Sequence, residues 1–188
     1  MSIAAVVLAA GASRRLGQLK QLVRFGGETL LERSVRVARE AGCSPVVVVL
    51  GAAYEQVIAG CSFGDVVTAI NNEWEKGMGS SIGLGVHAVQ NVAPDADGVV
   101  VMTCDQPAVT VKHLQRLITR SEVRASRYAG RNGVPAFFPK AYFHALTLLT
   151  GDVGARELLH GASSEELASG DLDVDTADDL KHARELLR

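Results

Sequence analysis

Cysteine is scarce in this chain of 188 residues. Cys43, Cys61 and Cys104 are the only three, and no two of them form a CxxC pair. An odd number of widely spaced cysteines argues against a disulfide framework and against a zinc ribbon. We therefore expect the protein to work in a reducing compartment, and we predict a cytoplasmic location.

An excess of positive charge is also lacking. Nineteen Lys and Arg residues face 21 Asp and Glu residues, which gives a formal net charge of -2. Non-specific nucleic-acid binding depends on a broad basic surface, so the composition argues against a nucleic-acid partner. Any binding of anions must therefore be local to a few residues.

Long hydrophobic runs are missing as well. The N-terminal apolar run covers only residues 3–10 and has no basic segment before it. A bilayer-spanning helix needs about 20 apolar residues, and a signal peptide needs a basic region and a cleavage site. We expect neither a membrane segment nor a secretory signal.

Four shorter aliphatic runs stand out instead. They are rich in valine and apolar throughout, which is typical of strands covered on both faces of a parallel sheet. The runs occupy residues 3–10, 45–51, 65–70 and 98–104.

Helical spacing lies between these runs. Apolar residues recur at intervals of three and four over residues 30–41, with Gly42 as the expected C-terminal cap, and again over residues 82–89 and 114–118. We expect Ser80 and Ser81 to cap the second of these helices. Alternating strands and helices predict an α/β domain with right-handed crossovers.

The last third of the sequence is less regular. Residues 125–139 mix aromatic side chains with glycine and proline, which predicts twisted strands and an antiparallel excursion. Residues 140–149 and 154–159 predict short helices, and residues 171–188 predict a strand followed by a helix capped by Thr176. No linker or repeat divides the chain, so we expect one domain over residues 1–188.

A basic loop follows the first predicted strand, where α/β proteins bind ligands. Neither GxGxxG nor the Walker pattern GxxxxGK[ST] fits the sequence after Gly11. The loop combines this glycine with the hydroxyl of Ser13 and the cations Arg14, Arg15 and Lys20. Such a combination is suited to a triphosphate. The alternative is a solvated basic loop with no ligand.

Aspartates supply a second candidate site. Asp105 follows the fourth aliphatic run, and Asp171, Asp173 and Asp175 alternate near the C-terminus. Magnesium is commonly held by one or two carboxylates together with substrate phosphates and water. Asp105 also fits a turn beside Pro107, and Asp175 also fits a helix cap.

These features belong to a longer pattern, LAAG-x-S-x-R-x-G-x-x-K. Its fixed positions are Leu8, Ala9, Ala10, Gly11, Ser13, Arg15, Gly17 and Lys20. Matching segments continue at residues 76–86, 104–107, 130–139, 151–159 and 173–180. Through these motifs nearly the whole chain resembles the nucleotidyltransferases of molybdenum cofactor maturation, in particular the molybdenum cofactor cytidylyltransferase group.

The resemblance implies a three-layer, Rossmann-like nucleotidyltransferase fold with a mostly parallel sheet, as in molybdopterin-guanine dinucleotide synthases. It implies transfer of a cytidylyl group from CTP to the phosphate of molybdopterin, with release of pyrophosphate. Arg15, Lys20 and Asp105 would be catalytic, and Asp105 and Asp175 would hold Mg²⁺. The nucleotide would contact Leu8, Ala9, Ala10, Gly11, Ser13, Arg15 and Lys20, whereas Arg14 lies at a variable position of the pattern.

Two further points concern substrate choice. Related guanylyltransferases usually carry LAGG, so the methyl group of Ala10 would narrow the base pocket in favour of cytosine. We expect the acceptor to contact Ser80 and Ser81, which offer hydroxyls and N–H groups at a helix start, and Arg156, whose planar guanidinium suits a phosphate or a pterin carbonyl. Gly133, Pro135 and Asp152 complete the predicted acceptor site, although Val134 stands where many relatives have His or Asn. An N-terminal helix cap at the serines and an Asp152–Arg156 ion pair are the structural alternatives.

The reaction implied by the resemblance does not require a general base. A phosphate monoester has a second pKa of about 6 and is mostly ionised at neutral pH. This agrees with five histidines that form no metal or catalytic spacing: His87, His113, His144, His160 and His182. The alternatives are another NTP, a sugar or polyol phosphate acceptor, and a non-catalytic chaperone that delivers cofactor. The expected partner is a molybdenum hydroxylase apoenzyme or its chaperone.

Overall fold

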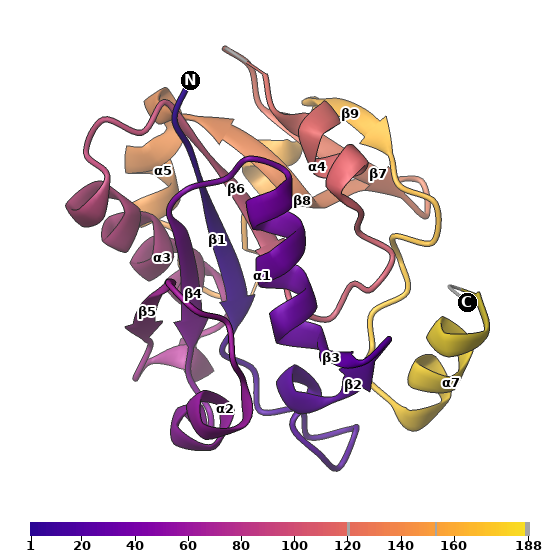
Figure 1. Cartoon of the computed structure of the whole chain (residues 1–188). Helices are drawn as coiled ribbons and strands as arrows, with labels where there is room; N and C mark the ends of the chain where they lie inside the picture. The colour runs from indigo at the N-terminus through magenta and orange to yellow at the C-terminus, as the bar shows by residue number, and fades with distance from the viewer. Residues whose placement is uncertain (120, 153, 187–188) are drawn as a thin grey trace.

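A seven-stranded sheet forms the centre of the computed structural model, which describes residues 1–119, 121–152 and 154–186 (Figure 1). The strand order is β5-β4-β1-β6-β8-β7-β9. The strands are β1 (Ile3–Ala9), β4 (Val46–Leu50), β5 (Val67–Ile70), β6 (Gly98–Thr103), β7 (Arg124–Tyr128), β8 (Arg131–Pro139) and β9 (Ser163–Glu166), and a separate hairpin joins β2 (Arg24–Phe25) to β3 (Glu28–Thr29).

Helices cover both faces of this sheet. The α-helices are α1 (Leu30–Glu40), α2 (Tyr54–Gly60), α3 (Met78–Val92), α4 (Val111–Leu117), α5 (Phe143–Thr147), α6 (Arg156–Leu159) and α7 (Ala177–Leu186). Short 3-10 helices are η1 (Lys20–Leu22), η2 (Trp74–Lys76) and η3 (Lys140–Tyr142). Among the described residues, no helix has the length and apolar character needed to cross a bilayer.

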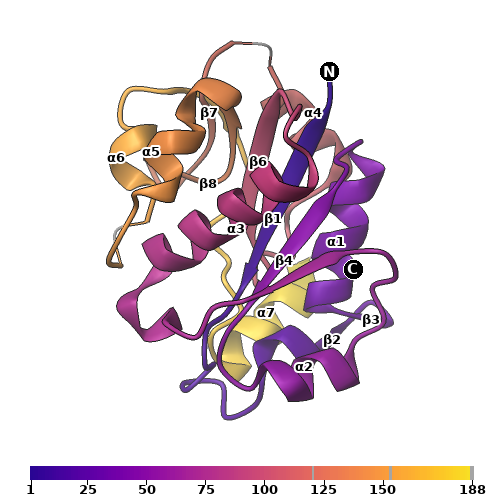
Figure 2. The same ribbon diagram turned by 90° about the vertical axis from the view of Figure 1, so that its left-hand side faces the viewer.

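Strand β1 shows why the fold has three layers. Its side chains alternate, so Ala5 and Val7 join a core with α1 and α4, whereas Val6 and Leu8 join a second core with α3 and α5. Figures 1 and 2 show the same arrangement, with α1 on one side of the sheet and α3 on the other. Because β1 is covered on both faces, its sequence is apolar at every position.

The sheet is mostly parallel, as the sequence predicted. Strand β1 pairs in parallel with β4 and β6, β4 pairs in parallel with β5, and β7 pairs in parallel with β9. Strand β8 is antiparallel to both β6 and β7. The predicted antiparallel excursion in the C-terminal third is thus the insertion of β8 between two strands that run the other way.

The predicted helix ends are only partly correct. Helix α1 begins with a capping box, in which Thr29 and Glu32 satisfy each other's backbone N–H groups, and Gly42 follows its end with a φ of +96°. Helix α3 begins at Met78, so Ser80 and Ser81 lie inside its first turn, and their predicted capping role is wrong. Residues 171–176 precede α7 without forming the predicted strand.

Candidate functional site

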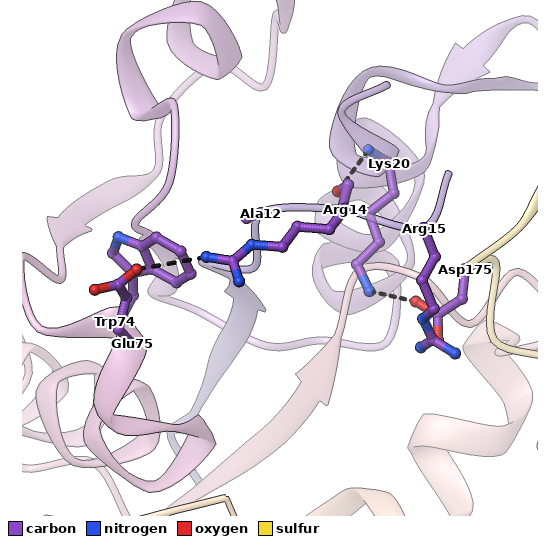
Figure 3. A pocket seen from close by; sticks show the side chains of 8 residues that line it. Ala12, Arg14, Arg15, Lys20, Trp74, Glu75 and Asp175 are labelled. Atoms are coloured by element: carbon purple, nitrogen blue, oxygen red, sulfur yellow. Dashed lines mark hydrogen bonds and ion pairs between the residues drawn. The ribbon is translucent and has the colours of Figure 1, made fainter. Parts of the chain in front are cut away.

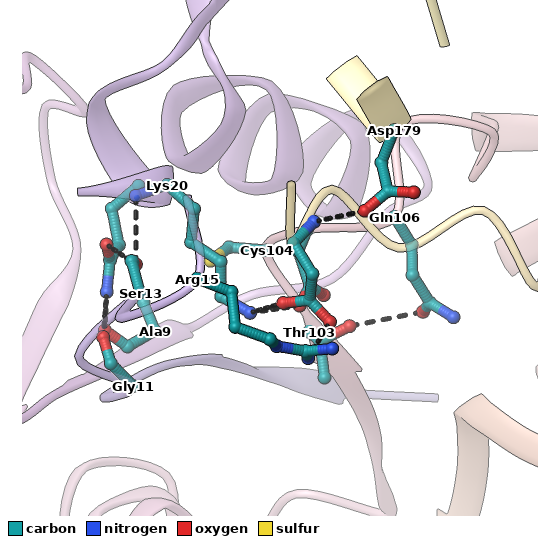
Figure 4. A network of polar contacts seen from close by, with 12 residues as sticks. Ala9, Gly11, Ser13, Arg15, Lys20, Thr103, Cys104, Gln106 and Asp179 are labelled. Atoms are coloured by element: carbon teal, nitrogen blue, oxygen red, sulfur yellow. Dashed lines mark hydrogen bonds and ion pairs between the residues drawn. The ribbon is translucent and has the colours of Figure 1, made fainter. Parts of the chain in front are cut away.

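The basic loop after β1 is closed by a buried amide. Gln21 is fully buried, and its Nε2 donates hydrogen bonds to the carbonyl oxygens of Ala9 (2.7 Å) and Gly11 (2.9 Å). Ser13 has a φ of +53°, and its Oγ accepts a hydrogen bond from the backbone N–H of Lys20 at 3.0 Å (Figure 4). These bonds fix the start of η1, and therefore the position of Lys20, relative to the end of β1.

Lys20 lies at the point where the strand order reverses. Strand β6 pairs with β1 on the side opposite β4, so a crevice forms at the carboxyl ends of β1 and β6. Lys20 Nζ lies 2.5 Å from Asp105 Oδ2, just after β6, and 3.1 Å from Asp175 Oδ1, just before α7. Backbone bonding from Val174 N to Asp105 O at 2.9 Å holds the two acidic segments together.

The site carries strongly coupled charges. Burial alone would lower the pKa of Lys20, but the attraction and hydrogen bond of Asp105 outweigh it, so the pKa is raised and the ammonium stays charged. Burial, followed by repulsion from Asp105 and Asp175, raises the pKa of Asp173 to about 7. Arg15 Nη2 contacts Asp175 Oδ2 at 2.6 Å. The carboxylates here repel one another, and the two cations offset only part of that repulsion.

Two pockets meet at Lys20. The first, of about 370 Å³, includes Ser13, Arg15 and Asp175 in its lining, and Figure 3 shows several of its side chains. The second, of about 290 Å³, extends along the end of β1 toward α3. Its lining comprises Leu8, Ala9, Ala10, Gly11, Lys20, Trp74, Gly77, Met78, Ser81, Thr103, Asp105 and Asp152.

The donor set is compatible with a hard divalent cation. Asp105 Oδ1 is buried and has no hydrogen-bond partner among the described residues, so one carboxylate oxygen remains available to a ligand. The structure, where described, holds no group of three or more His, Cys, Asp or Glu side chains arranged for a metal. Magnesium does not require such a cage, because one or two carboxylates suffice when substrate phosphates complete the shell.

The predicted acceptor residues are spread over several places. Asp152 and Ser81 line the second pocket, and Ser81 Oγ also accepts a hydrogen bond from Asn71 Nδ2 at 2.9 Å. Ser80 Oγ donates to the Gly77 carbonyl at 2.8 Å. Arg156 lines a different pocket, beside the β7–β8 hairpin.

Two other predicted acceptor residues have close packing neighbours. A Cβ at Gly133 would collide with the hydroxyl end of Tyr128, so a larger residue there would force this tyrosine side chain to move. Pro135, two residues after Gly133, is buried, and its carbonyl accepts a hydrogen bond from Ser126 Oγ at 2.6 Å. Neither residue is among those that line the two pockets at Lys20.

Several residues of the site were not predicted from the sequence. Gln21, Trp74 and Thr103 are absent from the candidate set, although Gln21 follows Lys20 directly and Thr103 ends a predicted strand. No spacing rule identifies a buried glutamine that closes a loop or a tryptophan that borders a pocket. Their proximity to the motifs was the available signal.

Comparisons with known proteins assign most of the chain to one family. Residues 5–168 match the family described as "MobA-like NTP transferase domain". The Bacillus subtilis purine catabolism protein PucB is 31% identical, covering 95% of this chain and 94% of its own. A probable molybdenum cofactor guanylyltransferase of Opitutus terrae is 34% identical, covering 73% of this chain and 67% of its own.

Solved structures show the same relationship. Rv0371c of Mycobacterium tuberculosis is 35% identical, with a TM-score of 0.84 over 98% of both chains. A second structure of Rv0371c, described as a complex with manganese, is 33% identical, with a TM-score of 0.79 over 98% of this chain and 99% of its own. Since the family match spans most of the sequence, the chain belongs to the MobA-like NTP transferases and is a nucleotidyltransferase.

Proposed function

We propose that this protein transfers a cytidylyl group from CTP to the phosphate of molybdopterin, with Mg²⁺ and with release of pyrophosphate. One observation carries the proposal. Lys20 Nζ lies between Asp105 and Asp175 at the carboxyl ends of β1 and β6, and Asp105 Oδ1 has no partner among the described residues. This places a fixed cation beside two carboxylates suited to a metal, as transfer between two anions requires.

Different side chains have different roles in this reaction. An oxygen of the acceptor phosphate forms a bond to the α-phosphorus of CTP, and the bond from that phosphorus to pyrophosphate breaks. The acceptor is already ionised at neutral pH, so no side chain has to remove a proton. Lys20 and Arg15 bind the triphosphate and offset its charge, while Gly11 and Ser13 shape the loop around it.

Asp105 and Asp175 are the residues that would hold the metal. Bound Mg²⁺ supplies charge neutralisation to the reacting phosphates. The Rv0371c structure described as a manganese complex supports a divalent ion in this family, because that protein shares the fold and 33% of the sequence. The orphaned oxygen of Asp105 supports the same assignment in this chain.

The base is assigned to the second pocket. Leu8, Ala9 and Ala10 form its β1 wall, and the methyl group of Ala10 occupies space that the glycine of an LAGG sequence would leave open. We take this as support for cytosine. GTP is the second candidate, because the Opitutus relative is described as a guanylyltransferase.

The predicted acceptor contacts lie in two different places, so they define the acceptor less narrowly than the nucleotide. Asp152 and Ser81 line the same pocket as Ala10, so they are the better-placed acceptor contacts, whereas Arg156, Gly133 and Pro135 would act from the β7–β8 side. The product would pass to a molybdenum hydroxylase apoenzyme or to its chaperone. A sugar or polyol phosphate acceptor would use the same catalytic residues.

Release of pyrophosphate tests the reaction. The protein is incubated with Mg²⁺, molybdopterin and either CTP or GTP, and pyrophosphate is followed over time. Dependence on CTP and molybdopterin is expected. Equal or faster release with GTP would overturn the choice of nucleotide, and release only with another phosphate would overturn the acceptor. A protein that binds nucleotide but never forms pyrophosphate would instead be a cofactor chaperone.

A further inference from the structure

The single tryptophan of the chain borders both pockets at Lys20. Trp74 begins η2, is half-buried, and contributes to the lining of the phosphate-side pocket and of the pocket along β1. Figure 3 shows its indole on the opposite side of the pocket from Lys20, behind Glu75. A large aromatic side chain that is half-buried in a polar cleft still has surface available to a ligand.

The turn that carries Trp74 is tied to α3 by side chains. Asn71 Nδ2 donates hydrogen bonds to Ser80 Oγ and Ser81 Oγ, both at 2.9 Å, and Asn71 Oδ1 accepts from the backbone N–H of Glu73 at 2.9 Å. Ser80 Oγ donates to the Gly77 carbonyl at the other end of the turn. Trp74 is therefore presented from a fixed segment, which lowers the entropic cost of using it in binding.

The root of Trp74 packs directly on the nucleotide motif. A Cβ built at Gly51 would lie 2.7 Å from Trp74 Cβ, 2.7 Å from the Ala10 carbonyl oxygen and 2.9 Å from Ala10 Cβ. Trp74 Cβ and Ala10 thus approach the same side of Gly51, and a side chain on Gly51 would collide with both. Trp74 and Ala10 consequently border the same narrow space.

A long-range contact links the basic loop to this turn. Arg14 Nη2 lies 3.6 Å from Glu75 Oε1, and both side chains are largely exposed (Figure 3). The pair spans the mouth of the phosphate-side pocket, next to Trp74. It joins the loop that we assign to phosphates to the turn that carries the aromatic ring.

We propose that the indole of Trp74 stacks on the base of the bound nucleotide. The inference rests on the proposed function in that it takes the second pocket as the base pocket. Phosphates have their cations on the Lys20 side, whereas the space between Trp74 and the apolar end of β1 suits a flat, weakly polar ring. Stacking is tolerant of base identity, so Trp74 supplies affinity while Ala10 supplies the choice between bases.

Tryptophan fluorescence tests the inference directly, because Trp74 is the only emitter of its kind. The wild-type protein is titrated with CTP, with GTP and with inorganic tripolyphosphate, each with Mg²⁺. We expect a nucleoside triphosphate to quench the emission, and we expect tripolyphosphate, which has no base, to bind with little quenching. Equal quenching by nucleotide and tripolyphosphate would overturn the inference.

Substitution provides the second arm, with affinities measured by calorimetry. Trp74→Leu keeps apolar volume without a ring, and we expect it to weaken nucleotide binding by roughly 10-fold while leaving tripolyphosphate affinity unchanged. Trp74→Phe restores a ring and should recover most of the affinity. A Trp74→Leu variant that binds nucleotide as tightly as the wild type would overturn the inference and leave the proposed reaction intact. If GTP quenches the emission and CTP does not bind, the stacking inference holds and the proposed use of CTP is overturned.

Discussion

Two clusters of charged side chains in this protein look similar and behave differently. The first, which we call the edge cluster, comprises Arg15, Lys20, Asp105 and Asp175 at the carboxyl ends of β1 and β6. The second, the helix cluster, comprises Glu28, Arg33, Arg36 and Glu40 on and before α1. Both contain ion pairs closer than 4 Å, so the presence of ion pairs alone does not distinguish a functional site.

The two clusters differ in whether their carboxylate oxygens all have hydrogen-bond or ion-pair partners. In the helix cluster Glu28 meets two guanidinium groups, and the hydrogen bond from Arg36 leads the causes that lower its pKa despite partial burial. In the edge cluster Lys20 pairs with both carboxylates and Arg15 pairs with Asp175, yet one oxygen of Asp105 stays without a partner in the described part of the chain. A charge cluster that leaves a buried oxygen unpaired next to a pocket is the one equipped to bind a ligand.

Removal of Lys20 should have the largest effect. Lys20→Ala or Arg15→Ala is expected to lower kcat/KM by on the order of 10²-fold or more, because each removes a preorganised charge from the triphosphate. Steady-state pyrophosphate release measures the loss. Arg14→Ala is the matched control in the same loop, and its effect should be smaller because Arg14 pairs, among the described residues, with the exposed Glu75 alone. An unchanged kcat/KM in the Lys20 variant would contradict the assignment.

Neutral variants of the acidic residues come next. Asp105→Asn and Asp175→Asn keep the side-chain shape, and we expect turnover to fall by about 10²-fold, with a higher requirement for Mg²⁺. Activity as a function of Mg²⁺ concentration measures both effects. Glu40→Gln, in the helix cluster, is the matched loss of a carboxylate that pairs with an arginine, and it should leave turnover unchanged. Wild-type metal dependence in both Asp variants would show that the metal is held elsewhere.

The edge cluster also shows what the sequence could and could not predict. The continuous valine runs predicted the parallel strands, and Lys20 and Asp105 were each predicted to follow such a run. The pairing of β1 with β6 brings the two residues together at one edge of the sheet. Asp175 was predicted from the alternating aspartates and from the matching motif at residues 173–180. The segment around it is irregular and does not form the predicted strand. Gln21 bonds to backbone carbonyl oxygens at the end of β1, and Trp74 borders a pocket that several elements line together, so local periodicity does not encode either contact.

The β7–β8 region illustrates a different limit. Its aromatic and glycine pattern predicted turns and an antiparallel excursion, but not the insertion of β8 between β6 and β7. Gly133 entered the candidate set through the resemblance, yet its tightest packing constraint is the ring of Tyr128. A motif glycine thus has at least a packing reason to be glycine, whatever its role toward the acceptor.

The choice of base depends on a single methyl group. Ala10→Gly removes a methyl group from a residue that lines the proposed base pocket, and we expect the ratio of kcat/KM for CTP to that for GTP to fall by roughly 10-fold. Parallel assays with the two nucleotides measure the ratio. Ala12→Gly, in the same loop but bordering the phosphate-side pocket, is the control and should leave the ratio near its wild-type value. A ratio that does not move in Ala10→Gly would remove Ala10 from base selection.

The smallest expected effect lies in the helix cluster and concerns stability alone. The folded-state pKa of Glu28 lies below its unfolded value, so its ionised form stabilises the fold above about pH 4.5, and this contribution is lost as the pH falls through the folded pKa. Glu28→Gln should therefore lower the free energy of unfolding by about 1 kcal/mol at pH 7, and by less near pH 3.5, since the side chain is partly exposed. Urea unfolding at the two pH values measures the difference. Pyrophosphate release should stay at the wild-type rate, because Glu28 is not among the residues that line the two pockets at Lys20. A variant that loses activity while keeping its stability would mean that the helix cluster also takes part in the reaction.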